Sequence, residues 1–308
     1  MTAPAATPRG AARFAGVAEM TGATLLWGAT FVVIRDTVAH VDPARLVFSR
    51  FAIAACVLAA VAMLARRPFG RAAWLGGAVS GACAAAGFGL QAAGLRHTAA
   101  GTSAFLTALG SLFAGLFAWP LLRQRPGAAL AAGIALATAG AALLTGVRAL
   151  GNGPGELLTI AGAVAFGLQV VALARFAPGA DPLALGAVQA AALAVCAAPF
   201  AGFAFAPALL APELLARFAY LVVAGSLVAP LLQVLAQRTL SAGRTGLLLG
   251  LEPVFAAVFA VTLGAERPPV RWWAGAALIL AAVALVESRA AASPGRRTSR
   301  PASARSAS

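Results

Sequence analysis

Residues 96–126, RHTAAGTSAFLTALGSLFAGLFAWPLLRQRP, resemble residues 238–268, RTLSAGRTGLLLGLEPVFAAVFAVTLGAERP. Aligned without a gap at an offset of 142 residues, the two segments are identical at 12 of 31 positions. The identities include Phe113 with Phe255 and Phe117 with Phe259, as well as the closing Arg-Pro pairs. Shared alanine and leucine content does not explain such matches, so the chain is predicted to contain two similar halves.

Both segments belong to a series of apolar runs of about 18 to 25 residues, which extends from Val17 to Val286. The chain has 308 residues, of which 61% are hydrophobic and only 10% are charged. Soluble domains are about a quarter charged, and a run of about 20 apolar residues crosses a bilayer. The chain is therefore predicted to be a polytopic membrane protein without room for a soluble catalytic domain.

The predicted fold class is an all-α integral membrane protein, because helices satisfy their own backbone groups in lipid. Ten transmembrane helices are predicted, over residues 17–38, 44–64, 72–95, 99–122, 127–146, 156–174, 183–205, 215–237, 241–264 and 270–287. A weaker match, at an offset of 139, aligns Trp27-Gly28 with Phe166-Gly167. Five helices per half is an odd number, so the second half must be inverted, as in many secondary transporters.

The predicted organisation follows from these spans. Residues 1–13 form an N-terminal tail, 14–147 and 156–287 form the two repeats, 148–155 form a linker, and 288–308 form a disordered basic tail. With the N-terminus inside, fifteen arginines lie on the cytoplasmic side and seven on the other, with Arg50 inside a span. This bias predicts that both termini are cytoplasmic.

The net charge of +14 does not indicate a nucleic-acid partner. Five of the arginines lie in the C-terminal tail, and no basic stripe is interleaved with aromatic residues. His40 and His97 lie far apart without an acidic cluster, so neither a metal site nor an enzyme active site is predicted, and no cofactor is expected.

Two charged residues inside the spans are candidate site residues, since charges in a bilayer are costly and commonly functional. Glu252 lies mid-span in the ninth run and could carry a coupling proton or bind a substrate ammonium group. Alternatively, it caps a backbone break at Pro253 or pairs with Arg50. Arg50 could bind a substrate carboxylate with both ends of its guanidinium group, or its long stem could reach the outer interface.

Uncharged candidates complete the predicted site. Gln91, Gln169 and Gln233 could line a polar cavity or form hydrogen bonds between helices. Trp27 and Phe31 could form aromatic cavity walls, although such residues more often pack in the core or lie at an interface.

Several motifs resemble the EamA-like family of the drug/metabolite transporter superfamily. They are Leu25-Leu26-Trp27-Gly28-Ala29-Thr30-Phe31, Arg50-Phe51, the segment from Gly94 to Thr107, Leu251-Glu252-Pro253-Val254-Phe255-Ala256 and Gly264-Ala265-Glu266-Arg267-Pro268. The resemblance implies a ten-helix transporter with cytoplasmic termini and a central cavity. The first half departs from it, with Arg123-Gln124-Arg125-Pro126 where a Gly-Glu-Arg-Pro-like end is common and Ser111 at the position of Pro253.

We therefore expect a secondary transporter of the inner membrane that exports a small amino-acid-like or amphipathic metabolite by alternating access. The alternatives are an importer and a non-transporting membrane protein, either a lipid-modifying enzyme or a scaffold. The expected partners are the substrate, the lipid bilayer and a coupling proton. The small residues of the fifth and tenth spans favour internal packing, with a homodimer surface as the alternative.

Overall fold

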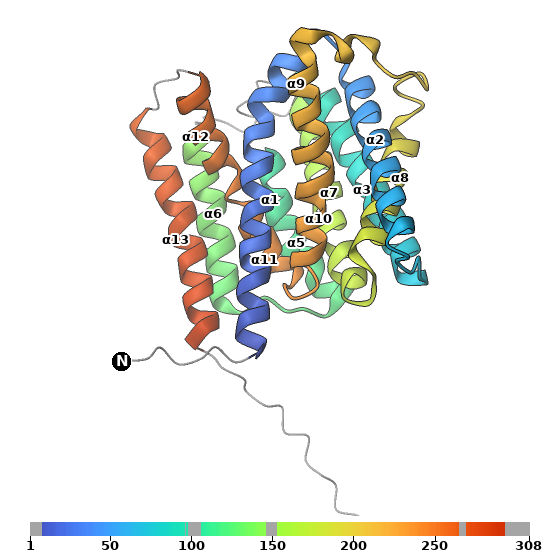
Figure 1. The fold of residues 1–308 in the computed structure, drawn as a ribbon. Helices are drawn as coiled ribbons and strands as arrows, with labels where there is room; N and C mark the ends of the chain where they lie inside the picture. The colour runs from blue at the N-terminus through green and yellow to red at the C-terminus, as the bar shows by residue number, and fades with distance from the viewer. Residues whose placement is uncertain (1–7, 96, 98–105, 146–152, 265–268, 293–308) are drawn as a thin grey trace, which may run out of the picture.

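The computed structural model describes residues 8–95, 97, 106–145, 153–264 and 269–292, and within these residues the regular structure is entirely helical. The long helices lie side by side in one bundle (Figure 1). Six helical segments are long and apolar enough to cross a membrane, and three shorter apolar helices accompany them. These observations agree with the predicted all-α membrane class.

The elements of the first half are α1 (Pro8–Val38), α2 (Pro43–Leu64), α3 (Arg71–Leu95), α5 (Gly110–Leu122) and α6 (Ala128–Thr145). Those of the second half are α7 (Pro154–Phe176), η1 (Ala177–Gly179), α8 (Pro182–Ala197), η2 (Pro207–Leu210), α9 (Pro212–Tyr220), the π-helical η3 (Leu221–Val228), α10 (Ala229–Ala236), α11 (Ala242–Leu249), α12 (Glu252–Gly264) and α13 (Val270–Ala292). Segments α9, η3 and α10 form one continuous apolar stretch.

Two helices begin in the same way, 139 residues apart. The side chains of Asp42 and Asp181 are the N-caps of α2 and α8, and each accepts hydrogen bonds from two backbone N–H groups of the first turn. A proline follows each aspartate, where its missing N–H costs nothing. The aligned caps place α2 and α8 at equivalent points of the two halves.

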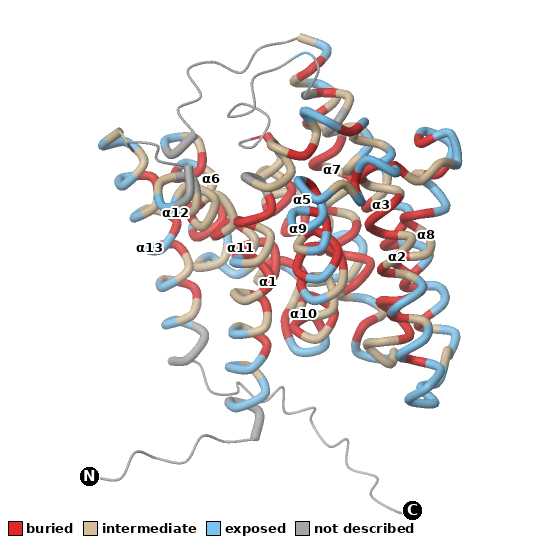
Figure 2. The backbone as a smooth tube through the Cα atoms, turned by 45° about the horizontal axis from the view of Figure 1, so that its top comes forward, coloured by how far each residue is buried: buried red, intermediate tan, exposed pale blue. Residues whose placement is uncertain are grey.

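The helices pack through small residues and a dispersed apolar core. α6 packs along α13 at one edge of the bundle, while α2, α3 and α8 pack together at the other, with α1, α5, α7 and α10 between them (Figure 1). The largest buried cluster includes Met20, Leu106, Leu248 and Ile279. Figure 2 shows buried segments concentrated inside the bundle and exposed segments along its outer helices.

The exposed faces are themselves apolar. Large side chains such as Val57, Val61 and Leu64 of α2 and Trp273 and Leu280 of α13 lie outside the packed interior. Apolar faces of this extent are unfavourable in water and are solvated by lipid chains in a bilayer. The outward surface therefore fits a multi-pass membrane protein.

Two predicted spans differ from the structure. The predicted ninth span, 241–264, contains one of the six membrane-spanning segments, Ala242–Phe259, but a tight turn at Gly250-Leu251 divides it into α11 and α12. Glycine is a poor helix former, and Pro253 lacks the N–H that would continue the ladder. The predicted seventh span, 183–205, ends early at Ala197, because Pro199 follows and Gly202 and Phe203 adopt positive φ.

The first predicted span differs at its start, and the fourth is described only in part. Helix α1 starts at Pro8, before the predicted residue 17. The first part of the predicted fourth span, 99–122, lies outside the described residues, and the remainder is helical from Leu106 to Leu122 with a turn at Leu109.

Candidate functional site

Trp27 connects α1 to the π-helical segment. Its indole Nε1–H donates to the carbonyl oxygen of Gly225 at 3.1 Å. In a π-helix, this carbonyl would accept from residue 230, five positions later, but Pro230 has no N–H. The indole therefore donates to a carbonyl oxygen that has no backbone donor because residue 230 is proline. A second hydrogen bond joins α1 to the same continuous stretch nearby, where the Tyr220 hydroxyl donates to the Leu26 carbonyl oxygen at 3.1 Å.

Glu252 is the first residue of α12, immediately after the interruption. Its side chain is partly buried and makes no hydrogen bond or ion pair with the residues that the structure describes, so it does not pair with Arg50. Gly28 packs directly against this point. A Cβ atom on Gly28 would lie 3.2 Å from the Glu252 carbonyl oxygen and 2.6 Å from Cβ of Phe255. Gly28, the neighbour of Trp27 in the chain, and Glu252 therefore belong to one α1–α12 contact.

The two halves are interrupted at corresponding positions. Helix α5 begins at Gly110 and α12 begins at Glu252, 142 residues later, which is the offset of the sequence repeat. Both interruptions border one small, mainly apolar crevice, lined by Ala108, Leu109, Ser111, Ala137, Thr138, Ala141 and Gly250. The hydroxyls of Ser111 and Thr138 donate to carbonyls of their own segments, at 2.7 and 2.8 Å. None of the predicted site residues lines this crevice.

Gln169 and Gln233 are brought together. The Nε2 group of Gln169 on α7 donates to Oε1 of Gln233 on α10 at 3.0 Å, and Gln233 donates in return at 3.4 Å. Both side chains are buried. Gln237, one turn further along the chain, donates to the Val170 carbonyl at 2.8 Å and leaves its own Oε1 without a partner in the described structure. Buried glutamine side chains therefore form the hydrogen bonds between α7 and the segment that contains α10 and Gln237.

The other two uncharged candidates lie elsewhere. Gln91 on α3 is only partly buried and donates to the Thr107 hydroxyl at 2.7 Å, so its amide joins α3 to the segment before α5. Phe31 belongs to α1, but its side chain lies outside the part of the structure that is described.

Arg50 lies inside the bundle and does not extend to an interface. Its residue surface is 4% exposed, and its Nε atom has no hydrogen-bond partner in the described part of the chain. The guanidinium carbon lies 4.7 Å from the ring centre of Phe51 and 5.2 Å from that of Phe88. This burial favours an interior role for Arg50 over the alternative in which its stem reaches the outer interface.

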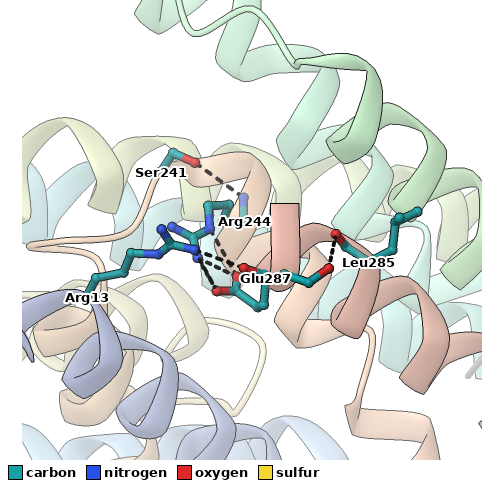
Figure 3. A network of polar contacts seen from close by, with 6 residues as sticks. Arg13, Ser241, Arg244, Leu285 and Glu287 are labelled. Carbon is teal, nitrogen blue, oxygen red and sulfur yellow. Dashed lines mark hydrogen bonds and ion pairs between the residues drawn. The ribbon is translucent and has the colours of Figure 1, made fainter. Parts of the chain in front are cut away.

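Sequence reasoning missed a charged cluster at one end of the bundle. The Arg244 side chain on α11 forms an ion pair with Glu287 on α13, with a distance of 3.1 Å from Nε to Oε1, and Arg13 on α1 reaches Glu287 at 3.3 Å (Figure 3). The Ser241 hydroxyl accepts from the Arg244 N–H and caps α11. The sequence signal for this cluster is Glu287, an acidic residue at the end of the last apolar run.

The fold and the polar interior define a class, a multi-pass helical membrane protein with two related halves. The EamA-like transporter family matches residues 15–146 and again residues 153–288, so this chain belongs to the EamA-like transporter family. The resemblance predicted from the sequence motifs is confirmed.

Individual relatives agree with this membership. The chain is 27% identical, over 268 residues, to an uncharacterised transporter of Archaeoglobus fulgidus, and the match covers 86% of this chain and 83% of that protein. A solved crystal structure has the same fold, with a TM-score of 0.75 and 22% identity over 90% of this chain and 98% of the other. The family and the archaeal relative point to a transporter rather than an enzyme.

Proposed function

We propose that this protein is a secondary transporter that exports a small amino-acid-like or amphipathic metabolite across the inner membrane by alternating access. Family membership carries the proposal, together with the helix interruptions at equivalent positions of the two halves. Interrupted membrane helices in corresponding positions are a feature of transporter binding sites. A proton gradient is the proposed source of energy.

Reciprocal contacts support an inverted arrangement of two five-helix repeats. Gly28 of α1 packs against Phe255 of α12, and the aligned Gly167 of α7 packs against Phe113 of α5, where an added Cβ would lie 2.7 Å from Phe113 Cβ. The first helix of each half thus contacts the fourth segment of the other. Any two-fold relation between the halves produces this exchange, and in this proposal the odd number of five helices per half places the axis in the membrane plane, near which transport sites lie.

In this proposal, the polar residues of the interior have distinct roles. Glu252 carries the coupling proton or contacts a substrate ammonium group, because it has no partner among the described residues and adjoins an interruption. Trp27, Phe31, Gln91, Gln169 and Gln233 shape the pathway, and Arg50 binds substrate. The start of α1 and the end of α13 lie at the same end of the bundle, which supports two cytoplasmic termini (Figure 1).

The test compares extracellular metabolites from cells that carry the wild type, the Glu252→Gln variant or an empty vector, with matched protein levels in the membrane. We expect one compound to accumulate outside only with the wild type. Glu213→Gln is the matched control, since it removes one carboxylate from an exposed first turn of α9. This variant should export normally.

Two results would count against the proposal. Equal export by Glu252→Gln would make Glu252 structural and remove the coupling role. If no external compound distinguishes the wild type from the vector, and a compound is instead depleted from the medium, then the direction is import.

A further inference from the structure

Arg50 is a cation that no described residue of the protein neutralises. It lies in α2, in the eighth position of the helix and about 10 Å from its start at 1.5 Å per residue. It is 4% exposed, its Nε lacks an acceptor, and no ion pair or hydrogen bond joins its guanidinium group to the described residues. Buried charges in proteins are normally paired, so an unpaired arginine at this depth needs an explanation.

Aromatic rings contact the guanidinium group but cannot replace an acceptor. Phe51 and Phe88 lie within cation–π distance, at 4.7 and 5.2 Å. Such contacts stabilise the positive charge through the ring faces. They leave the five N–H donors, which lie in the guanidinium plane, without oxygen partners among the residues that the structure describes. The plane of the group is therefore available for an anion.

The aromatic surface beside Arg50 extends across both halves of the molecule. Phe88 on α3 makes an edge-to-face contact with Phe166 on α7, with ring centres 5.1 Å apart. The ring of Phe166 lies over Gly87, where an added Cβ would approach it to 2.6 Å. Only glycine at position 87 allows this placement. The cation thus has an apolar surface that is formed by α2 and α3 of one half and α7 of the other.

The equivalent position in the second half shows that the fold does not require a charge here. Asp42-Pro43 aligns with Asp181-Pro182 at an offset of 139, and the same offset aligns Arg50 with Gln189. Gln189 is also buried, at 6% exposed, and its Oε1 atom also has no hydrogen-bond partner among the described residues. A neutral amide is accommodated at one of two equivalent positions, so the charge of Arg50 is not a packing necessity.

We propose that Arg50 binds the carboxylate of a monoanionic substrate whose apolar or aromatic body lies against Phe51, Phe88 and Phe166. A guanidinium group matches a carboxylate with two parallel hydrogen bonds. One unpaired cation balances one negative charge, which favours a carboxylate over a phosphate dianion. The proposal rests on the transport function proposed above and specifies its substrate class. Because Arg50 is closed off in this conformation, a ligand enters when the surrounding helices separate during the cycle.

The experiment measures binding and needs no turnover. Purified full-length protein in detergent is titrated with radiolabelled phenylacetate in a scintillation proximity assay, with unlabelled competitors. We expect saturable binding that is displaced by 3-phenylpropionate, weakly by acetate, which lacks the apolar body, and not by phenethylammonium. Phenyl phosphate should compete less well than phenylacetate.

Variants in α2 test the role of the cation, and one variant in α3 tests the aromatic surface. Arg50→Gln should weaken phenylacetate binding by at least about tenfold, the loss typical of a charge-assisted pair. Arg50→Lys keeps the charge but not the two parallel bonds, so it should bind with intermediate affinity. Arg45→Gln, which removes an exposed arginine of the same helix, should bind as the wild type does. Phe88→Leu should weaken phenylacetate more than acetate.

The outcomes distinguish failure of the anion site from failure of the export proposal. The proposal is overturned if no carboxylate binds the wild type, or if phenyl phosphate binds the wild type more tightly than phenylacetate does. It is also overturned if Arg50→Gln is folded and binds phenylacetate as tightly as the wild type. If phenylacetate binding depends on Arg50 while no compound is exported, the anion site stands and the export proposal fails. If export depends on Glu252 while no carboxylate binds, the export proposal stands and the anion site fails.

Discussion

Gly28 lets α1 approach the backbone of α12 at the point where Glu252 begins the helix. A Cβ at this position would lie 2.6 Å from Phe255 Cβ and 3.0 Å from the backbone nitrogen of Ala256, so neither neighbour can rotate away. Gly28→Ala should therefore lower the free energy of unfolding by about 1 to 3 kcal/mol, the usual cost of overpacking. Thermal unfolding of the purified protein in detergent measures this change.

Gly89→Ala is the matched control. Gly89 lies inside α3 with no atom within 4 Å of an added Cβ. Alanine is favoured over glycine in a helix by up to about 1 kcal/mol, so this variant should be as stable as the wild type or slightly more stable. Equal destabilisation by both substitutions would show that close contact with α12 is not the reason for glycine at position 28.

The sequence identifies which residues are unusual but not which residues they meet. Arg50 and Glu252 are recognisable because charges are rare in apolar runs. The pairing of Gln169 with Gln233, 64 residues apart, is not predictable in the same way. Lipid and protein interior are both apolar, so a membrane helix shows no clear alternation of polar and apolar faces to fix its rotation. Contacts such as that between Arg50 and Phe88 therefore cannot be predicted from the sequence and are seen only in the structure.

At the level of helices, apolar runs predict most elements, while irregularities depend on local chemistry. Gly250 and Pro253 are signals for the turn between α11 and α12. The equivalent turn at Leu109 has no such signal, because Ser111 stands where the second half has proline. The π-helical turns of η3 precede Pro230, but neither hydrophobic periodicity nor the position of this proline predicts them.

The π-helical segment should depend on Pro230. Replacing Pro230 with alanine supplies an N–H that can close the backbone ladder and compete with Trp27 for the Gly225 carbonyl. We expect slower amide hydrogen exchange over residues 221–236 in Pro230→Ala than in the wild type, measured by mass spectrometry. Trp27→Phe, which removes only the indole donor, should leave exchange in this segment unchanged or faster. Faster exchange in Pro230→Ala would contradict this explanation of η3.

On the scale of the whole molecule, three helices that are distant in sequence meet in the charged cluster of Arg13, Arg244 and Glu287 (Figure 3). These side chains are 17 to 29% exposed, so water screens the interactions only in part. One carboxylate holds α1 of the first half to α11 and α13 of the second. In the proposed alternating-access cycle, these contacts must break when this end of the bundle opens, and Glu287 then stabilises the closed state.

Glu287→Gln should therefore shift the population toward the state that is open at this end. Loss of about 1.4 kcal/mol changes such an equilibrium about tenfold. The measurement is the labelling rate, in inside-out vesicles, of a cysteine introduced at buried Ala242 after Cys56, Cys83 and Cys196 are replaced by alanine. We expect about tenfold faster reaction with an impermeant maleimide in Glu287→Gln, a smaller increase in Glu287→Asp, which keeps the charge on a shorter stem, and no change in Glu213→Gln. Unchanged labelling in Glu287→Gln would mean that the cluster ties the helices together without controlling access, because a contact equally present in both states cannot shift their populations.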